Sequence, residues 1–304
     1  MPELFSGSTP PASFLNPGLL IFLALGYGVA VLLLRELAMR WGCGLWGFFV
    51  LGLAYSVFNE GLLAKTSIVE QNLPINQYDH YGYYLGVSWP WMAGIGCWHA
   101  CASVIFPIAF THHLFPHASF RAWFHWKTAL AIGVALLLLS CAVFLGTSEK
   151  RIKGSPGQLV LFLALILFGL AAARLSKQPS RQSNAAGPGL LPLLFGLSVV
   201  IPFWGLVALA SAKVPLVVFF VALIGIVMVY AWILDRQQWL SPPAFLLFAI
   251  GWYLHNVVQA LLFIGVASRN PGRALITAIA DTALLVFLFH QARLARRLPL
   301  RQAI

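Results

Sequence analysis

The sequence predicts an all-α fold: a polytopic transmembrane bundle of about nine helices that forms a single integral membrane domain over residues 1–304. Two observations carry this prediction. Hydrophobic residues make up 60% of the chain and charged residues only 9%, whereas a soluble domain has roughly half and a quarter, respectively. Apolar runs of about 20 residues, the length that crosses a hydrocarbon core as a helix, recur along almost the whole chain. Little sequence remains for a separate soluble domain.

Each predicted span is one of these apolar runs. The first run follows a segment without the basic residues that begin a secretory signal peptide, so we expect it to remain in the protein as a span. The predicted spans cover residues 18–38, 45–65, 88–110, 127–147, 156–174, 189–211, 214–234, 243–266 and 273–293.

The loops between the spans carry the charge that orients the bundle. With the N-terminus outside, the inner loops and the C-terminal tail hold 12 Lys and Arg residues and the outer loops hold 7. Because basic residues favour the cytoplasmic side, this split predicts an outside N-terminus and an inside C-terminus in the inner membrane of a bacterium. The same placement accounts for the formal charge of +11, so the expected partner is the lipid bilayer and not nucleic acid.

Two loops differ from the others in composition. Residues 67–91, on the outer side, combine tyrosines and tryptophans with prolines, which is typical of a segment that lies in the membrane interface or covers a site. Residues 176–188, on the inner side, are rich in Ser, Pro and Gly and predict a flexible linker between the fifth and sixth spans.

Ionisable side chains inside the predicted spans are the candidates for function, because a charge at the bilayer centre is costly. Two acids and two histidines qualify: Glu60 in the second span, His99 in the third, His255 in the eighth and Asp281 in the ninth. At about 1.5 Å per residue, the first three lie within roughly 6 Å of one another along the membrane normal. Each of these three shares a helix face with other polar or small residues, which are Ser56, Asn59, Gly96, Ser103, Asn256 and Gln259.

The residues alone leave two interpretations of this polar group open. Turned toward the bundle interior, the side chains can form a buried hydrogen-bond network that joins helices without chemistry. A carboxylate shielded from bulk water beside histidines can instead act as an acid/base site. In a metal-dependent variant, His99, His255 and a carboxylate form a ligand set that suits zinc or iron. No cofactor is otherwise expected.

Three short motifs on separate spans resemble those of a known family. The stretches "EGLLAK" (60–65) and "HNVVQ" (255–259), together with His99, resemble the E-E-x-x-x-R, H-x-x-x-N/D and F-x-x-x-H motifs of the CPBP family, the type II CAAX prenyl proteases and bacteriocin-processing proteins. The resemblance implies an intramembrane peptidase in which Glu60 activates a water molecule with help from His99. It also implies that His255 and Gln259 stabilise the oxyanion, and that the substrate is a membrane-associated peptide or protein.

The motifs are degenerate in this chain. Gly61 stands in place of the second glutamate of the family motif, Lys65 in place of arginine, and Ile95 in place of phenylalanine. Gln259 stands in place of asparagine or aspartate. A second register puts Asn59 at the first glutamate position, which removes the general base. The residues expected to support the site are Asn59, Lys65, Asn256 and Asp281.

Functions from two other classes fit the same residues. In a proton- or ion-coupled transporter, Glu60, Asp281 and the histidines would line a path through the membrane. In a non-catalytic scaffold or membrane subunit, the aromatic outer loop 67–91 would bind a partner protein.

Overall fold

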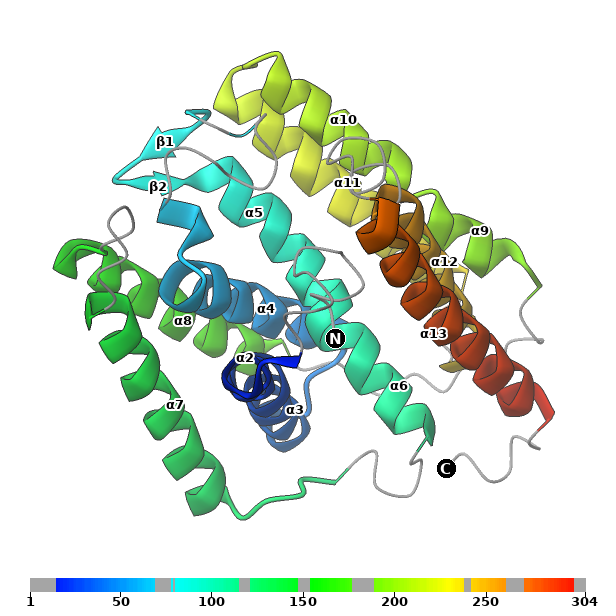
Figure 1. Cartoon of the computed structure of the whole chain (residues 1–304), viewed down its shortest axis with the longest axis horizontal. Coiled ribbons are helices and arrows are strands. Elements are labelled where there is room, and N and C mark those ends of the chain that lie inside the picture. The colour runs from blue at the N-terminus through cyan, green and yellow to red at the C-terminus, as the bar shows by residue number, and fades with distance from the viewer. Residues whose placement is uncertain are drawn as a thin grey trace.

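A computed structural model of the chain describes residues 15–68, 78, 80–114, 121–146, 154–176, 189–237, 242–260 and 271–297. Within these ranges the chain is almost entirely helical (Figure 1). The sheet in these ranges is one short hairpin, in which β1 (Tyr83–Tyr84) pairs antiparallel with β2 (Val87–Ser88). The all-α prediction is confirmed.

Seven helices in the described ranges are long and apolar enough to cross a membrane. They coincide with the first seven predicted spans to within a few residues, so the chain is a multi-pass membrane protein. These helices are Pro17–Trp41, Leu45–Leu63, Trp89–His112, Trp126–Gly146, Pro156–Leu175, Leu191–Ser211 and Leu216–Arg236.

The eighth and ninth predicted spans are also helical, as α12 (Pro242–Ala260) and α13 (Pro271–Arg297). Their apolar stretches are shorter, Ala244–His255 and Ala278–Gln291. The count of nine spans and the outside N-terminus therefore stay predictions. The predicted linker 176–188 lies outside the described residues from position 177 onward.

The first three membrane-length helices each change from α to π geometry along their length. The first comprises α2 (Pro17–Leu23), η2 (Ala24–Val29) and α3 (Ala30–Trp41); the second comprises α4 (Leu45–Ser56) and η3 (Val57–Leu63); the third comprises α5 (Trp89–Trp98), η6 (His99–Ile105) and α6 (Phe106–Leu114). The segments η2, η3 and η6 are π-helical. Such segments are rare and frequently occur at functional sites. The later helices are α7 (Trp126–Gly146), α8 (Pro156–Leu175), α9 (Leu191–Leu197), α10 (Val200–Ser211) and α11 (Leu216–Arg236).

Local sequence explains several helix ends. The Asn16 side chain caps α2 by accepting the backbone N–H of Gly18 at 2.9 Å. At the start of α8, Ser155 and Gln158 form a capping box, in which each side chain accepts the backbone N–H of the other. The helix α3 ends at Gly42, whose φ of 63° is the left-handed conformation that favours glycine.

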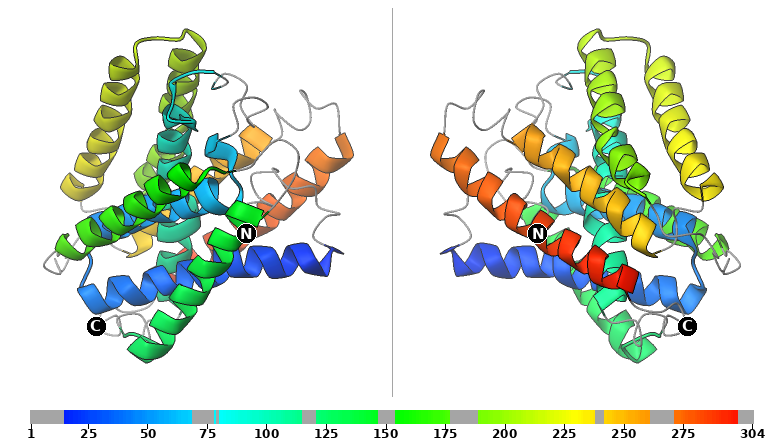
Figure 2. Two further views of the ribbon diagram at one scale, coloured as in Figure 1. Left: turned by 90° about the vertical axis from the view of Figure 1, so that its left-hand side faces the viewer. Right: turned by 90° about the vertical axis from the view of Figure 1, so that its right-hand side faces the viewer.

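The helix α12 packs against both α9 and α13 on one side of the bundle (Figures 1 and 2). Its contact with α9 is close because each helix turns a glycine toward the backbone of the other. A Cβ atom at Gly196 would lie 2.0 Å from the carbonyl oxygen of Phe248, and a Cβ atom at Gly251 would lie 2.0 Å from that of Leu193. Small residues commonly permit such close helix pairs in membranes.

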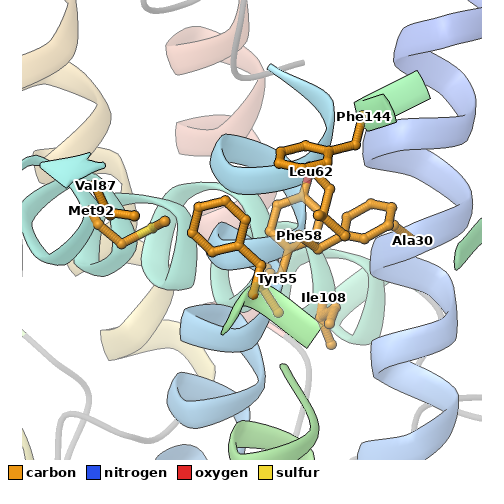
Figure 3. Packing of buried hydrophobic residues seen from close by; sticks show 10 residues of the cluster. Ala30, Tyr55, Phe58, Leu62, Val87, Met92, Ile108 and Phe144 are labelled. Atoms are coloured by element: carbon orange, nitrogen blue, oxygen red, sulfur yellow. The ribbon is translucent and has the colours of Figure 1, made fainter. Parts of the chain in front are cut away.

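The second and third membrane-length helices also meet at a glycine. A Cβ atom at Gly52 would lie 2.4 Å from the Cα atom of Ala100 in η6. Next to this contact lies a buried apolar cluster, of which Figure 3 labels Ala30, Tyr55, Phe58, Leu62, Val87, Met92, Ile108 and Phe144. The glycine contact and the cluster together hold η3 beside η6.

Gly52→Ala is expected to lower the stability of the fold. The added methyl group has no room against the backbone of Ala100, and overpacking of this kind typically costs about 1–3 kcal/mol. Thermal unfolding of the purified protein in detergent measures the loss. Gly225→Ala in α11 is the matched control, because a Cβ atom there would meet nothing within 4 Å. Equal stability of the two variants would contradict the packing argument.

The β-hairpin falls within the predicted outer loop 67–91. Its two-residue turn, Leu85 and Gly86, has φ values of 54° and 70°, and a type I′ turn requires this positive sign at both positions. Tyr78 and Tyr81, which precede the hairpin, pack edge-on against Phe219 of α11. The described part of the loop therefore packs on the helix bundle, while residues 69–77 and 79 lie outside the described residues.

Candidate functional site

The candidate site lies where the three π-helical segments meet. The segment η2 contributes Tyr27, η3 contributes Asn59 and Glu60, and η6 contributes His99 and Ser103. Hydrogen bonds connect side chains from all three segments. Because π-helical turns are rare and frequently functional, their meeting in one polar cluster distinguishes this site from an ordinary helix contact.

Glu60 and His99 form a hydrogen-bonded pair at the centre of this cluster. His99 Nε2 lies 2.7 Å from Glu60 Oε1, and Asn59 Nδ2 donates to the same oxygen at 3.1 Å. The other carboxylate oxygen, Oε2, accepts a hydrogen bond from the Thr66 hydroxyl. Only 7% of Glu60 and 2% of His99 are exposed. The structure thus brings together two of the three residues that lie at matched depth in the sequence prediction.

One arrangement of protons fits the two shortest contacts of His99. The Ser103 hydroxyl lies 2.8 Å from Nδ1 and can donate to it, so that a protonated Nε2 donates to Glu60 at 2.7 Å. The longer contact of Nε2 with Asn59 Nδ2, at 3.3 Å, is then not a hydrogen bond, because both nitrogens are donors. Asn59 Nδ2 also lies 3.2 Å from the Tyr27 hydroxyl and donates to it. The side chains that contact the Glu60 carboxylate then all act as donors. This arrangement suits an ionised carboxylate that can accept a further proton.

Thr66 connects Glu60 to the aromatic outer loop. It begins the short 3₁₀ helix η4 (Thr66–Ile68), and its hydroxyl accepts a hydrogen bond from Trp91 Nε1 at 2.9 Å. Trp91 packs edge-on against Tyr78. Burial raises the pKa of the Tyr78 hydroxyl, so this tyrosine stays neutral and adds no charge beside the site. The loop therefore contacts the carboxylate through one intermediate side chain.

Thr66→Val is expected to reduce the fraction of Glu60 that is ionised at a given pH. Valine keeps the branched shape but removes the hydroxyl donor to Oε2, and fewer donors favour the neutral acid. Infrared absorption of the carboxylate, followed against pH with Glu60→Gln as the reference for subtraction, measures this fraction. Thr66→Ser retains the hydroxyl and should resemble the wild type. Identical titrations of the Val and Ser variants would contradict the role of the hydroxyl.

His255 lies on α12, outside this hydrogen-bonded network. Its ring packs against Phe203 of α10 with centroids 5.6 Å apart, and only 2% of the residue is exposed. Among the described residues, neither of its ring nitrogens has a hydrogen-bond partner. The nearby Tyr253 hydroxyl donates to the carbonyl of Ala102 in η6 at 3.0 Å, and α12 also contacts α6 of the same membrane-length helix. Assembly of His255 with Glu60 and His99 stays a prediction.

Three other predicted site residues lie on the last two helices. Asn256 and Gln259 belong to α12, and Asp281 belongs to α13, but their side chains lie outside the described part of the chain. Within the described part, no group of three His, Cys, Asp or Glu side chains is arranged to hold a metal ion. The metal-dependent variant stays a prediction.

Two departures from the family motif have structural consequences beside Glu60. A Cβ atom at Gly61 would lie 3.0 Å from the ring of Phe162 in α8, so a second glutamate at this position would require the ring to shift. Lys65 has a left-handed φ of 58°, and only 4% of the residue is exposed. Its ammonium group donates to the carbonyl of Val143 in α7 at 3.2 Å. Lys65 thus ties the second membrane-length helix to α7, although the charge count assigned it to an outer loop.

A second charged cluster lies at the far end of the first and third membrane-length helices, and the sequence interpretation missed its acid. Glu36 is fully buried and only 2% of Arg35 is exposed. Arg35 Nη1 donates to Glu36 Oε1 at 2.8 Å, and Arg35 Nε lies 3.3 Å from His112 Nε2. The Arg35 guanidinium also stacks on Trp123, 3.8 Å from the ring centroid. Glu36, like Glu60, is therefore a buried acid within a membrane-length helix.

The Glu36 carboxylate holds the segment that precedes α7. Its oxygens accept the backbone N–H of Trp123 at 2.8 and 2.9 Å and that of Phe124 at 3.2 Å. Arg40 lies 3.7 Å from Glu36 Oε2 and also donates to the carbonyl of Phe124. The four-residue spacing of Glu36 and Arg40 is a sequence signal for such a pair. It was hidden because both flanking arginines were counted as loop charges.

Comparison with known proteins agrees with the membrane fold. The model of an uncharacterized membrane protein family matches residues 1–289. No curated protein and no solved structure matches the chain, so the resemblance to glutamate-dependent intramembrane proteases rests on the motif residues alone. The family match covers nearly the whole chain, and the chain therefore belongs to this uncharacterized membrane protein family.

Proposed function

We propose that the chain is a glutamate-dependent intramembrane peptidase of the bacterial inner membrane, acting on a membrane-associated peptide or protein. The observation that carries this proposal is the 2.7 Å contact between Glu60 and His99, in a cluster built from three π-helical segments. A buried carboxylate that is paired with an imidazole can take a proton from water inside a membrane. Helix–helix attachment alone would not require an ionisable pair at this depth.

In this proposal Glu60 is the general base. Its carboxylate takes a proton from a water molecule, and the water oxygen attacks the carbonyl carbon of the scissile peptide bond. The carbon–nitrogen bond then breaks, and Glu60 returns the proton to the leaving amine. His99 and Asn59 donate to one carboxylate oxygen and Thr66 to the other, so they orient the base. One water molecule is consumed and no cofactor is required.

His255 is the proposed donor to the oxyanion, with Gln259 beside it as the resemblance implies. The supporting observation is that both His255 ring nitrogens lack a hydrogen-bond partner among the described residues. A buried polar group without a partner is costly, and a substrate carbonyl would satisfy an N–H at this position. The hydrogen bond from Tyr253 of α12 to the carbonyl of Ala102 in η6 supports this assignment, because it connects α12 to the helix that carries His99.

Membranes from cells that produce the chain test the proposal without a known substrate. Chemical labelling of new N-termini, followed by mass spectrometry, compares wild-type membranes with membranes that contain equal amounts of the Glu60→Gln variant. The peptidase proposal predicts cleaved membrane proteins or peptides in the wild-type sample that are absent from the variant sample. Identical sets of N-termini in the two samples would overturn the proposal.

A proton-coupled transporter is the second candidate, and a specific observation favours it. Ionisable clusters occur at two levels of the third membrane-length helix: His99 pairs with Glu60 of the second, and His112 lies beside Arg35 and Glu36 of the first. His99 and His112 are 13 residues apart on one membrane-length helix, or about 20 Å at the helical rise per residue. A path between such levels could carry protons across the bundle. Proton uptake into proteoliposomes that contain the purified chain tests this candidate.

A further inference from the structure

Residues 121–127 form an exposed basic and aromatic segment at one end of the bundle. Trp123 is 42% exposed and Trp126 is 53% exposed, and Arg121 and Lys127 are also exposed. The segment runs into α7, which begins a membrane-length helix at Trp126, so it lies at a face of the membrane. Tryptophan at this level marks the membrane interface, and basic residues there attract anionic headgroups.

Charged side chains of the first membrane-length helix contact this segment and fix its conformation. Glu36 accepts the backbone N–H groups of Trp123 and Phe124, and Arg40 donates to the carbonyl of Phe124. Arg35 stacks on the Trp123 ring. The backbone is therefore fixed at two consecutive residues, and one indole is fixed at its ring. We call residues 121–127 the pinned segment.

The charge balance around the pinned segment is strongly positive. Within residues 35–40 and 121–127 there are four cations, Arg35, Arg40, Arg121 and Lys127, and one acid, Glu36. Glu36 is fully buried under these groups, so the exposed charge is positive. Lys127 Nζ lies 5.9 Å from the centroid of the Trp126 ring, which keeps this cation beside an exposed indole. The surface thus presents cations and indoles together at the membrane face.

We propose that the pinned segment binds the headgroup of an anionic phospholipid, with Arg121 and Lys127 at the phosphate and Trp123 and Trp126 at the boundary between headgroup and acyl chains. The indoles and the position at the membrane face favour a lipid over free phosphate. Because the backbone is fixed before binding, little conformational freedom is lost when the lipid binds. This proposal does not depend on peptidase activity.

Titration of phosphatidylglycerol into the purified protein in a neutral detergent, read by native mass spectrometry, tests the surface. Each cation near an anionic lipid surface is worth about 1 kcal/mol, so Arg121→Gln and Lys127→Gln should each weaken binding roughly five-fold. Arg174→Gln is the matched control, since Arg174 is exposed on the last turn of α8. That turn lies at the same end of the bundle, where the Cys43 thiol contacts the carbonyl of Ala173. An equal loss in the control, or no loss in either test variant, would overturn the proposal.

Two further measurements distinguish lipid binding by the pinned segment from attraction by charge alone and from a general anion site. Glu36→Gln raises the net charge by one, so attraction by charge alone predicts tighter binding of phosphatidylglycerol. The proposal predicts weaker binding, because the amide nitrogen of glutamine replaces one carboxylate oxygen and cannot accept the backbone N–H groups that this oxygen holds. The comparison is made below the unfolding temperature of the variant. Tighter binding by this variant would reject the proposal. Excess inorganic phosphate should leave lipid binding unchanged, whereas full competition would identify an anion site without lipid specificity and also reject it.

Discussion

Glu60→Gln is expected to abolish peptide hydrolysis and to preserve the fold. Glutamine has nearly the same volume and its carbonyl oxygen can still accept hydrogen bonds from the neighbouring donors, but it cannot take a proton from water. Loss of a general base commonly lowers a rate about 10²–10⁴-fold. Thermal stability should stay the same or rise, because the variant removes a buried charge. The measurement is the yield of new N-termini in membranes that contain matched amounts of each protein.

Variants of the other ionisable residues separate the peptidase from its rivals. His255→Ala should also abolish cleavage if this histidine stabilises the oxyanion, whereas Asp281→Asn should have a smaller effect, because Asp281 has no counterpart in the family motifs. In a transporter, loss of either Glu60 or Asp281 would disable movement of the ion. In a scaffold, Glu60→Gln would keep both stability and function. Unchanged peptide cleavage by the Glu60→Gln variant would therefore overturn the peptidase proposal.

The helices could be predicted from the sequence because their cause is local and repeated. A membrane core demands about 20 apolar residues per span, and each run carries that signal by itself. The depth of Glu60 and His99 followed from the same count of residues, and their contact at 2.7 Å agrees with it. The other partners of Glu60 are harder to predict. The contact of Thr66 with Glu60 has no signal in the sequence, because it depends on the path that the chain takes after the second membrane-length helix ends.

The π-helical segments had no signal in the sequence. A π-helical turn keeps the apolar composition of the α-helix around it, so the runs of apolar residues that predict the spans do not distinguish the two. Glu36 was missed for a different reason. Its burial depends on the segment before α7, which folds back and supplies the backbone N–H groups of Trp123 and Phe124. A residue near the predicted end of a span cannot be distinguished from a solvated one until that segment is placed.

Glu36→Ala is expected to be the most destabilising of these variants. Glu36 is fully buried, and its carboxylate satisfies Arg35, only 2% exposed, as well as two backbone N–H groups. Removing one partner of a buried ion pair leaves an uncompensated charge and typically costs about 3–5 kcal/mol. The variant also leaves the backbone N–H groups of Trp123 and Phe124 without their acceptor, which adds to this cost. The free energy of unfolding in detergent, or the melting temperature where unfolding is irreversible, measures the effect.

Arg40→Ala is the control for this prediction, because it also removes a cation near Glu36. Arg40 is 29% exposed and its nitrogen lies 3.7 Å from Glu36 Oε2, so water can replace it and the loss should be much smaller. The double variant Arg35→Met with Glu36→Leu should recover most of the stability that Glu36→Ala loses, since well-packed apolar residues can replace a buried ion pair. If Glu36→Ala is no less stable than Arg40→Ala, the buried carboxylate does not hold the segment before α7. The fixed backbone of the pinned segment would then need another cause.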